Sequence, residues 1–378
     1  MKQERTTAIK RYFRNADMFL LGAALLVCTI GLVLIYSATH SYQTSKFVIV
    51  QCGGILLGVI AFVVLSVFDL ERLARFWPVI FVFNLLFQIS LQFFGSGGEE
   101  VGNNSWINLG IINIQPGEIG KLLFIITFAR HIYALKDRLN SPLSVGMLLM
   151  HAVLITSAVF YFSKDLGVAI MYIAIMFTML FASGMSTLWV GGLFAGVCGA
   201  FPLLWRFVFG DYQKLRILVV FEPEISEKYA YQAKQSMLAI GSGRLFGNGF
   251  LQGLQTQRSR IPAKHTDFIF AVCGEEFGFI GIVVLLTLLT VIIVRVFYNS
   301  TRTDDLFNRL LCVGVGSMIM VQVLINVGMC MGIMPVVGLT LPFVSYGGTS
   351  VLTMLASLGV VSGCLLRRKP SWLRNRDE

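Results

Sequence analysis

The sequence predicts an all-α polytopic membrane protein, and three observations predict this class: its composition, its apolar runs and the placement of its basic residues. Of the 378 residues 56% are apolar and only 13% are charged, and the mean hydropathy is +0.76. Soluble domains carry about 25% charged and about 45–50% apolar residues. The composition therefore excludes an ordinary soluble enzyme, a disordered chain and a disulfide-rich secreted scaffold.

Ten stretches are long and apolar enough to cross a bilayer, for which a helix needs about 20 mostly apolar residues. We expect spans at residues 17–37, 47–68, 76–94, 114–134, 143–163, 166–183, 186–208, 268–297, 307–333 and 346–366. The basic N-terminus enters the first span without a small-residue cleavage site, which indicates an uncleaved span. One long loop, at about 209–266, separates the seventh and eighth spans, and residues 1–378 are predicted to form a single membrane domain.

The basic residues predict the orientation of these spans. Ten spans place both termini on one side, and 18 Lys and Arg residues lie on that side, whereas the short loops of the other side hold two, Lys46 and Lys164. Cytoplasmic loops collect Lys and Arg. We therefore expect both termini in the cytoplasm and the long loop outside, and the net charge of +10 does not indicate a nucleic-acid partner.

Charged residues inside a bilayer cost about 2.5–3.5 kcal/mol each on insertion scales, so they are candidates for function. Glu118 and Lys121 are three residues apart in the fourth span and share one helix face. They form either a neutralising pair that locks helix packing or part of a substrate cavity. Glu275 and Glu276 lie in the eighth span and require partners, for which Lys121 is one candidate.

Two further acids stand where the chain enters the membrane. Asp165 directly precedes the sixth span, where it either caps the helix or takes part in a site. Asp267 directly precedes the eighth span, two residues after His265. Either Thr266 or Asp267 caps that helix, or the carboxylate of Asp267 serves as a general base for a hydroxyl group. The pattern alone leaves both interpretations open.

Two segments are rich in glycine. In the long loop, residues 241–249 follow a basic stretch that begins near Lys214. They suit either a polyprenyl-pyrophosphate head group, because glycine lets backbone N–H groups approach phosphate, or a re-entrant loop that needs tight turns. Residues 326–350 combine glycine and proline beside the membrane, which indicates a broken helix and a re-entrant turn. Such a break also fits a transporter.

Several of these stretches resemble the SEDS family of bacterial cell-wall glycosyltransferases, the relatives of RodA, FtsW and SpoVE. The resemblance rests on four motifs: Gln115-Pro-x-Glu118-x-x-Lys121, His265-Thr-Asp-Phe-Ile-Phe-Ala, Asn326-x-Gly-Met-x-x-Gly-x-x-Pro335 and Leu341-Pro-Phe-x-Ser345-Tyr-Gly-Gly-Thr-Ser350. The chain departs from the family at Ser105, where the family has Arg, and at Gly117, where it has Ser. The short tails resemble RodA more than FtsW.

The resemblance implies an inverting peptidoglycan glycosyltransferase that polymerises lipid II at the outer face of the cytoplasmic membrane, for cell elongation or division. Asp267 is then the catalytic base that accepts the proton of the attacking sugar hydroxyl. The residues expected to bind substrate are Glu118, Lys121, Asp165, Lys214, Arg216, Gln232, Gln235, Ser236, His265 and Ser345.

The resemblance also implies the partners. These are the membrane, the undecaprenyl lipid and a class B penicillin-binding protein, with a divalent cation, Mg or Mn, as a candidate cofactor and no organic cofactor. A lipid II flippase is the alternative, and a scaffold that only recruits the penicillin-binding protein is a third interpretation. A flippase needs charged groups along a path open to both sides, whereas a polymerase needs them gathered at the outer face.

Overall fold

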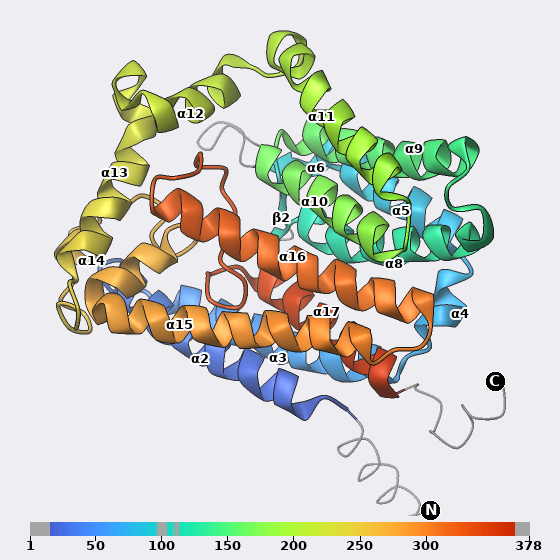
Figure 1. Ribbon diagram of the computed structural model, residues 1–378. Coiled ribbons are helices and arrows are strands. Elements are labelled where there is room, and N and C mark those ends of the chain that lie inside the picture. The colour runs from blue at the N-terminus through green and yellow to red at the C-terminus, as the bar shows by residue number, and fades with distance from the viewer. Residues whose placement is uncertain (1–15, 97–103, 109, 111–112, 367–378) are drawn as a thin grey trace, which may run out of the picture.

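The protein is a bundle of long helices, described by a computed structural model that covers residues 16–96, 104–108, 110 and 113–366 (Figure 1). The long helices are α2 (Met18–His40), α3 (Lys46–Val67), α5 (Trp77–Ile89), α8 (Pro116–Ala134), α9 (Pro142–Ala158), α10 (Leu166–Ala182), α11 (Thr187–Phe207), α15 (Ile269–Thr301), α16 (Leu306–Cys330) and α17 (Gly348–Leu366).

Eight segments of the described chain are long and apolar enough to cross a membrane. The predicted fourth and sixth spans fall outside this set. Helix α8 carries Glu118 and Lys121 among its 19 residues, and α10 is apolar but only 17 residues long. The all-α polytopic class is therefore confirmed, and the count of ten spans stays a prediction.

Shorter elements connect the long helices. The predicted third span bends at Ser90 into α5 and α6 (Leu91–Phe94), and the fifth ends in a π-helical turn, η2 (Val159–Ser163). The other short elements are α4 (Leu70–Ala74), η1 (Lys136–Arg138), α12 (Asp211–Phe221), η3 (Pro223–Ile225), α13 (Glu227–Ser242) and α14 (Leu254–Gln257). Helices α12, α13 and α14 occupy the predicted long loop and form one flank of the bundle (Figure 1).

A small antiparallel sheet, which the sequence did not predict, precedes α8. Its strands are β1 (Gly95–Ser96), β2 (Trp106–Asn108) and β3 (Asn113–Ile114), in the order β1-β2-β3. The central residue Ile107 pairs with Gly95 on one side and with Ile114 on the other. The sheet thereby directs the chain into the first turn of α8.

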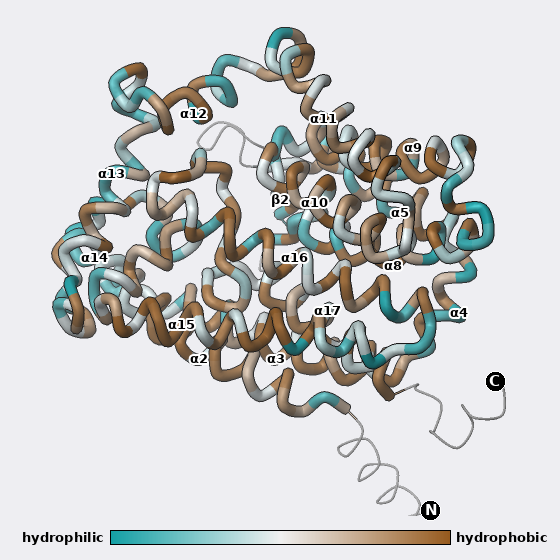
Figure 2. The backbone as a smooth tube through the Cα atoms, in the orientation of Figure 1, coloured by the Kyte–Doolittle hydropathy of each residue, from teal (hydrophilic) through white to brown (hydrophobic). Residues whose placement is uncertain are grey.

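Helices α16 and α17 are the most buried of the candidate spans, and the long helices around them consist largely of hydrophobic residues (Figure 2). Close approach of α3 to α17 depends on small residues, because a Cβ atom at Gly54 would lie 3.0 Å from the Cα atom of Gly348. Helix α11 buries no residue in its apolar window. Apolar side chains on such outer faces match lipid, which is as apolar as they are.

Helix α15 is interrupted at Gly278, whose backbone adopts φ 66° and ψ −161°. The glycine-rich run of the long loop packs against this break. There the N–H of Phe279 donates to the carbonyl of Arg244 (2.8 Å), and the N–H of Asn248 donates to that of Glu275 (3.0 Å). A Cβ atom at Gly247 would collide with the carbonyl oxygen of Glu276. Packing in a re-entrant loop, one of the two alternatives, therefore accounts for these glycines.

The described chain begins and ends at the same end of the bundle, because the N–H of Asp17 donates to Ser362 Oγ at 3.0 Å. The C-terminal half of α15 reaches this end too, where Arg295 Nε lies 2.8 Å from Asp17 Oδ2. After the break at Gly278, α15 runs from Phe279 to Thr301 and is about 35 Å long at about 1.5 Å per residue. The break therefore lies toward the opposite end, and so does Asp267, whose carbonyl accepts from Asn326 near the C-terminal end of α16.

Candidate functional site

A buried ion pair stands in the first two turns of α8. Lys121 Nζ lies 2.7 Å from Glu118 Oε1, and the side chains are 0% and 3% exposed. Two side chains of α5 hold the start of α8 in place: Gln88 Nε2 donates to the carbonyl of Pro116 (3.1 Å), and Asn84 Nδ2 donates to the carbonyl of Gly120 (3.1 Å). In the described chain Glu118 Oε2 has no hydrogen-bond partner.

Gln322 of α16 joins this pair and connects it to the segment between α16 and α17. Its Oε1 accepts from Lys121 Nζ at 2.9 Å, and its Nε2 donates to the carbonyl of Thr340 at 2.9 Å. Gln322 was not among the residues predicted from the sequence. Its pattern could have identified it, because Gln322 is a polar residue in an apolar span and lies one turn before Asn326 on the same helix face.

Asp165 caps the N-terminus of α10, where its Oδ1 accepts from the N–H of Val168 at 3.0 Å. Ser105 Oγ lies 3.5 Å from the other carboxylate oxygen. Burial raises the pKa of Asp165 to about 6 against the hydrogen bond from Val168, and the negative charges of Glu118 and Asp267 also raise this pKa. Asp165 therefore combines the capping role with a place in a charged cluster.

Asp267 stands half-buried just before α15. The N-cap of α15 is Phe268 and no side chain caps it, so the expectation that Thr266 or Asp267 caps this helix is wrong. Asn326 Nδ2 donates to its carbonyl at 2.8 Å, and its carboxylate faces the backbone of Gly338. Burial raises the pKa of Asp267 to about 6, and the positive charge of Arg216 and the Thr266 hydroxyl oppose this rise. The carboxyl group is therefore mostly ionised at neutral pH and has a higher proton affinity than an exposed aspartate.

Arg216 reaches this cluster from α12. Its Nη1 donates to the carbonyl of Val336 at 2.9 Å, and its guanidinium carbon lies 4.3 Å from the centre of the Tyr212 ring. In the described chain Arg216 Nε has no hydrogen-bond partner. Asp165, Tyr212, Arg216 and Pro335 help to line a cavity of about 20 Å³. Such a volume holds about one water molecule.

The structure thus brings together five predicted residues: Glu118, Lys121, Asp165, Arg216 and Asp267. They come from the starts of α8, α10 and α15 and from α12. All lie at the end of the bundle opposite to the described chain ends. Acids and cations gathered in this way are able to hold a proton, a diphosphate or a metal ion.

The other predicted residues lie around this cluster. Ser345 Oγ donates to the carbonyl of Thr266 at 2.6 Å, so it supports the chain beside Asp267. His265 is enclosed by aromatic rings, and burial and the charge of Lys264 lower its pKa to about 4. The buried Ser236 donates to the carbonyl of Cys330 at 2.7 Å. The remaining predicted residues lie half-buried on α12 and α13: Lys214, Gln232 and Gln235.

Lys121 was a candidate partner of Glu275 and Glu276, and this expectation is wrong. Both oxygens of Glu275 accept hydrogen bonds at the start of α14, among them one from the N–H of Gln255 at 2.7 Å. Glu276 Oε1 accepts from Ser37 Oγ at 2.6 Å. Neutral donors thus contact both acids locally, although Glu276 Oε2 has no hydrogen-bond partner among the described residues. The two acids belong to the scaffold that holds the loop against α15.

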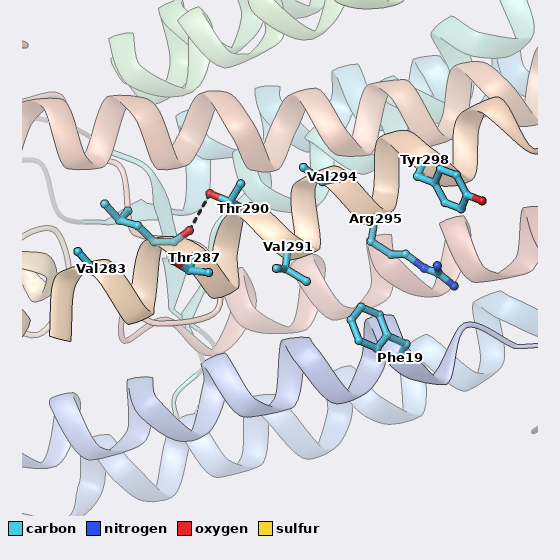
Figure 3. A pocket seen from close by; sticks show the side chains of 9 residues that line it. Phe19, Val283, Thr287, Thr290, Val291, Val294, Arg295 and Tyr298 are labelled. Atoms are coloured by element: carbon cyan, nitrogen blue, oxygen red, sulfur yellow. Dashed lines mark hydrogen bonds between the residues drawn. The ribbon is translucent and has the colours of Figure 1, made fainter. Parts of the chain in front are cut away.

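A larger hollow, of about 580 Å³, lies on the side of α15 that faces α2 (Figure 3). It is lined mostly by apolar and threonine side chains of α15, with Phe19 and Arg295 toward the end of the chain termini. Among the described residues that line it, none belongs to the predicted site. The hollow faces the lipid region and is separate from the charged cluster.

The fold and the cluster define an integral membrane protein that carries a charged site at one end of its helix bundle. The family model for FtsW, RodA and SpoVE, described as cell cycle protein, matches residues 17–369. The chain belongs to this family.

Among curated proteins, the chain is 34% identical to the peptidoglycan glycosyltransferase MrdB of Escherichia coli strain K12 over 349 residues, which cover 89% of this chain and 91% of MrdB. It is 32% identical to the probable peptidoglycan glycosyltransferase FtsW of Bacillus subtilis in an alignment of 391 positions that covers 98% of this chain and 95% of FtsW.

Two solved structures share its fold. A chain from a study of a peptidoglycan synthase complex that coordinates polymerization and crosslinking aligns with a TM-score of 0.78 at 28% identity, covering 92% of this chain and 96% of that one. The rod shape determining protein RodA of Thermus thermophilus aligns with a TM-score of 0.67 at 27% identity, covering 93% of this chain and 96% of RodA. These relatives identify a bacterial membrane protein of the glycosyltransferase class.

Proposed function

We propose that this chain polymerises lipid II into glycan strands at the outer face of the bacterial cytoplasmic membrane, with both termini in the cytoplasm. The observation that carries the proposal is the charged cluster of Glu118, Lys121, Asp165, Arg216 and Asp267 at the end opposite to the described chain ends. A flippase requires charged groups along a path through the bilayer. The gathering of the five charged residues at one end of the bundle therefore favours the enzyme over the flippase.

The reaction joins two lipid-linked disaccharides. The 4-hydroxyl oxygen of one GlcNAc attacks the anomeric carbon of MurNAc, the new C–O bond forms opposite the breaking bond to the diphosphate oxygen, and the α-linkage becomes β. The electron pair leaves with undecaprenyl pyrophosphate. Asp267 accepts the hydroxyl proton, for which a pKa of about 6 suits a base at neutral pH.

The departing diphosphate needs positive charge near it. Arg216 offers an Nε–H that has no hydrogen-bond partner among the described residues, and a guanidinium fork suited to phosphate oxygens. Lys121 supplies a second cation, which Glu118 and Gln322 hold in place. Because α8, α10 and α15 begin at the cluster, their N-terminal dipole ends add a further positive potential.

A divalent cation, Mg or Mn, fits two of these residues. The negative charge of Asp267 raises the pKa of Asp165, so the two carboxylates act on each other. In phosphate enzymes Mg²⁺ often takes one or two carboxylates plus substrate oxygens. No group of three or more His, Cys, Asp or Glu side chains in the described chain is arranged as a full metal site. Such a cation would supply charge neutralisation of the diphosphate.

We propose a class B penicillin-binding protein as the partner. The structural neighbour from a peptidoglycan synthase complex supports such an assembly.

The test is polymerisation of lipid II by the purified protein with its penicillin-binding partner. Asp267→Asn keeps the size of the side chain and removes its basicity, so polymer should be lost. Asp211→Asn is the matched control, because Asp211 is an exposed acid on α12. Wild-type amounts of polymer from Asp267→Asn would overturn the assignment. Lipid II translocation without polymer, measured in liposomes, would favour the flippase.

A further inference from the structure

A second hollow opens where α2 ends and the chain turns into α3. It has a volume of about 390 Å³ and is lined by Tyr36, Thr39, His40, Ser41, Gln43, Thr44 and Ser45. No Asp, Glu, Lys or Arg is among the described side chains that line it. Since α2 starts at the end that holds Asp17, the hollow lies at the same end of the bundle as Asp267.

Aromatic rings form part of its wall. Tyr36 is 46% exposed, and its ring stacks on Phe250 with 6.3 Å between centroids and a 20° angle between planes. The His40 ring lies 5.8 Å from that of Tyr36. This arrangement holds an aromatic surface open to solvent beside several hydroxyl groups. A pyranose ring has the complementary chemistry, with an apolar C–H face and hydroxyls along its edge.

The turn that forms the hollow is tied to the loop that ends at Asp267. Lys264 Nζ donates to Ser41 Oγ at 2.9 Å, and the Tyr42 ring meets the His265 ring edge-on with 6.0 Å between centroids. The His265 ring also lies 5.6 Å from that of Tyr346. The turn that lines the hollow therefore contacts, through Tyr42 and Ser41, the segment of Lys264 and His265 that directly precedes the proposed base.

We propose that this hollow binds sugar residues of the growing glycan strand. The proposal rests on the proposed function, and it adds a binding site for neutral, β-linked amino sugars remote from the charged cluster. The hollow lacks a cation for a phosphate, and the ammonium of Lys264 is committed to Thr256, Ser41 and Ser259. A neutral sugar therefore matches it better than a lipid phosphate.

A second contact of this kind has a defined consequence for polymer length. A strand held at two places stays at a high effective concentration near the base after each transfer. Loss of the contact should therefore release strands earlier.

The test uses the full-length protein and the double variant Tyr36→Ala/His40→Ala. Tyr161→Ala is the matched control, because Tyr161 is 72% exposed in η2 and does not line the hollow. Binding of a lipid-free, β-linked GlcNAc tetrasaccharide, which carries no charge, is measured by saturation-transfer NMR, and strand length and initial rate are measured with lipid II. Removal of an aromatic anchor is expected to weaken tetrasaccharide binding about tenfold.

In the double variant, mean strand length should fall by a larger factor than the initial rate. The variant Tyr36→Phe keeps the ring and should therefore show the strand length and tetrasaccharide binding of the wild type. Unchanged binding and strand length in a folded double variant would overturn the proposal, as would binding of glycerol 3-phosphate in place of the tetrasaccharide. Tetrasaccharide binding without any polymer from the wild type would instead refute the proposed function, so the two failures are distinct.

Discussion

Removal of the ammonium of Lys121 separates a packing role from a functional one. Lys121 Nζ lies between Glu118 Oε1 (2.7 Å) and Gln322 Oε1 (2.9 Å). In Lys121→Met the carboxylate of Glu118, which is only 3% exposed, loses its charged partner. Its second oxygen, Oε2, already has no hydrogen-bond partner in the described chain. Breaking one side of a buried ion pair costs about 3–5 kcal/mol. Glu118→Gln should cost a similar amount, because it leaves the ammonium unpaired.

The double variant Glu118→Gln/Lys121→Met removes both charges. Because replacement of a buried pair by neutral side chains of similar size is often close to neutral, it should lie within about 1–2 kcal/mol of the wild type. The free energies of unfolding of the wild type, the two single variants and the double variant form one double-mutant cycle. Their polymerisation rates from lipid II, measured in the same nanodiscs, form another.

If Lys121 acts on the diphosphate, the double variant regains stability but stays inactive. A double variant as active as the wild type would reduce the pair to a packing device. Single variants as stable as the wild type would refute the burial argument itself, because the cost follows from the enclosed position of both side chains.

Three further outcomes are expected. The polymerisation rate should fall as the pH drops below about 6, since protonated Asp267 accepts no proton. Because the pKa of Asp267 is raised from 3.8 to about 6, the native state binds more protons than the unfolded chain between these pH values, so the contribution of Asp267 to stability decreases as the pH rises through this window. Titrations of the polymerisation rate and of the free energy of unfolding check the two signs. Gln322→Leu should lower the maximal rate because Lys121 loses an acceptor, and Gln322→Glu should restore activity in part; equal maximal rates for Gln322→Leu and wild type would contradict this role. Gly247→Ala should reduce thermal stability, measured by unfolding in detergent, because the new methyl group meets the carbonyl of Glu276, whereas Gly241→Ala, where a Cβ finds open space, should not.

The fold class followed from composition and apolar runs because lipid imposes a simple rule on every span. The two segments that fell short of that rule, α8 and α10, contribute Glu118, Lys121 and the cap Asp165 to the site. The charges of α8 thus counted against its recognition as a span, whereas α10 is apolar and fell short only in length. The small sheet before α8 escaped prediction because strands of two or three residues carry no readable alternation.

Glu118 and Lys121 were predictable because charges in an apolar span stand out against their surroundings, and their pairing was one of the two interpretations. The partners that come from distant parts of the chain were not predictable. Lys121 was one candidate partner for Glu275 and Glu276, but these acids accept hydrogen bonds from the start of α14 and from Ser37. Gln322 is 201 residues from Lys121. Pairings at such separations are set by helix packing, which local patterns do not encode.

The choice between a helix cap and a chemical role, which the sequence left open at both Asp165 and Asp267, comes out differently at the two acids. An ionised carboxylate is costly to bury, and the N-terminus of a helix lowers that cost because it offers free N–H groups and positive potential. Asp165 accepts from the N–H of Val168 and is at the same time an electrostatic neighbour of Glu118 and Asp267, so capping and a place in the charged cluster are compatible there. At the start of α15 the N-cap is Phe268 and makes no side-chain cap hydrogen bond, so capping does not account for Asp267 and the proposed role as a general base is the alternative that is left.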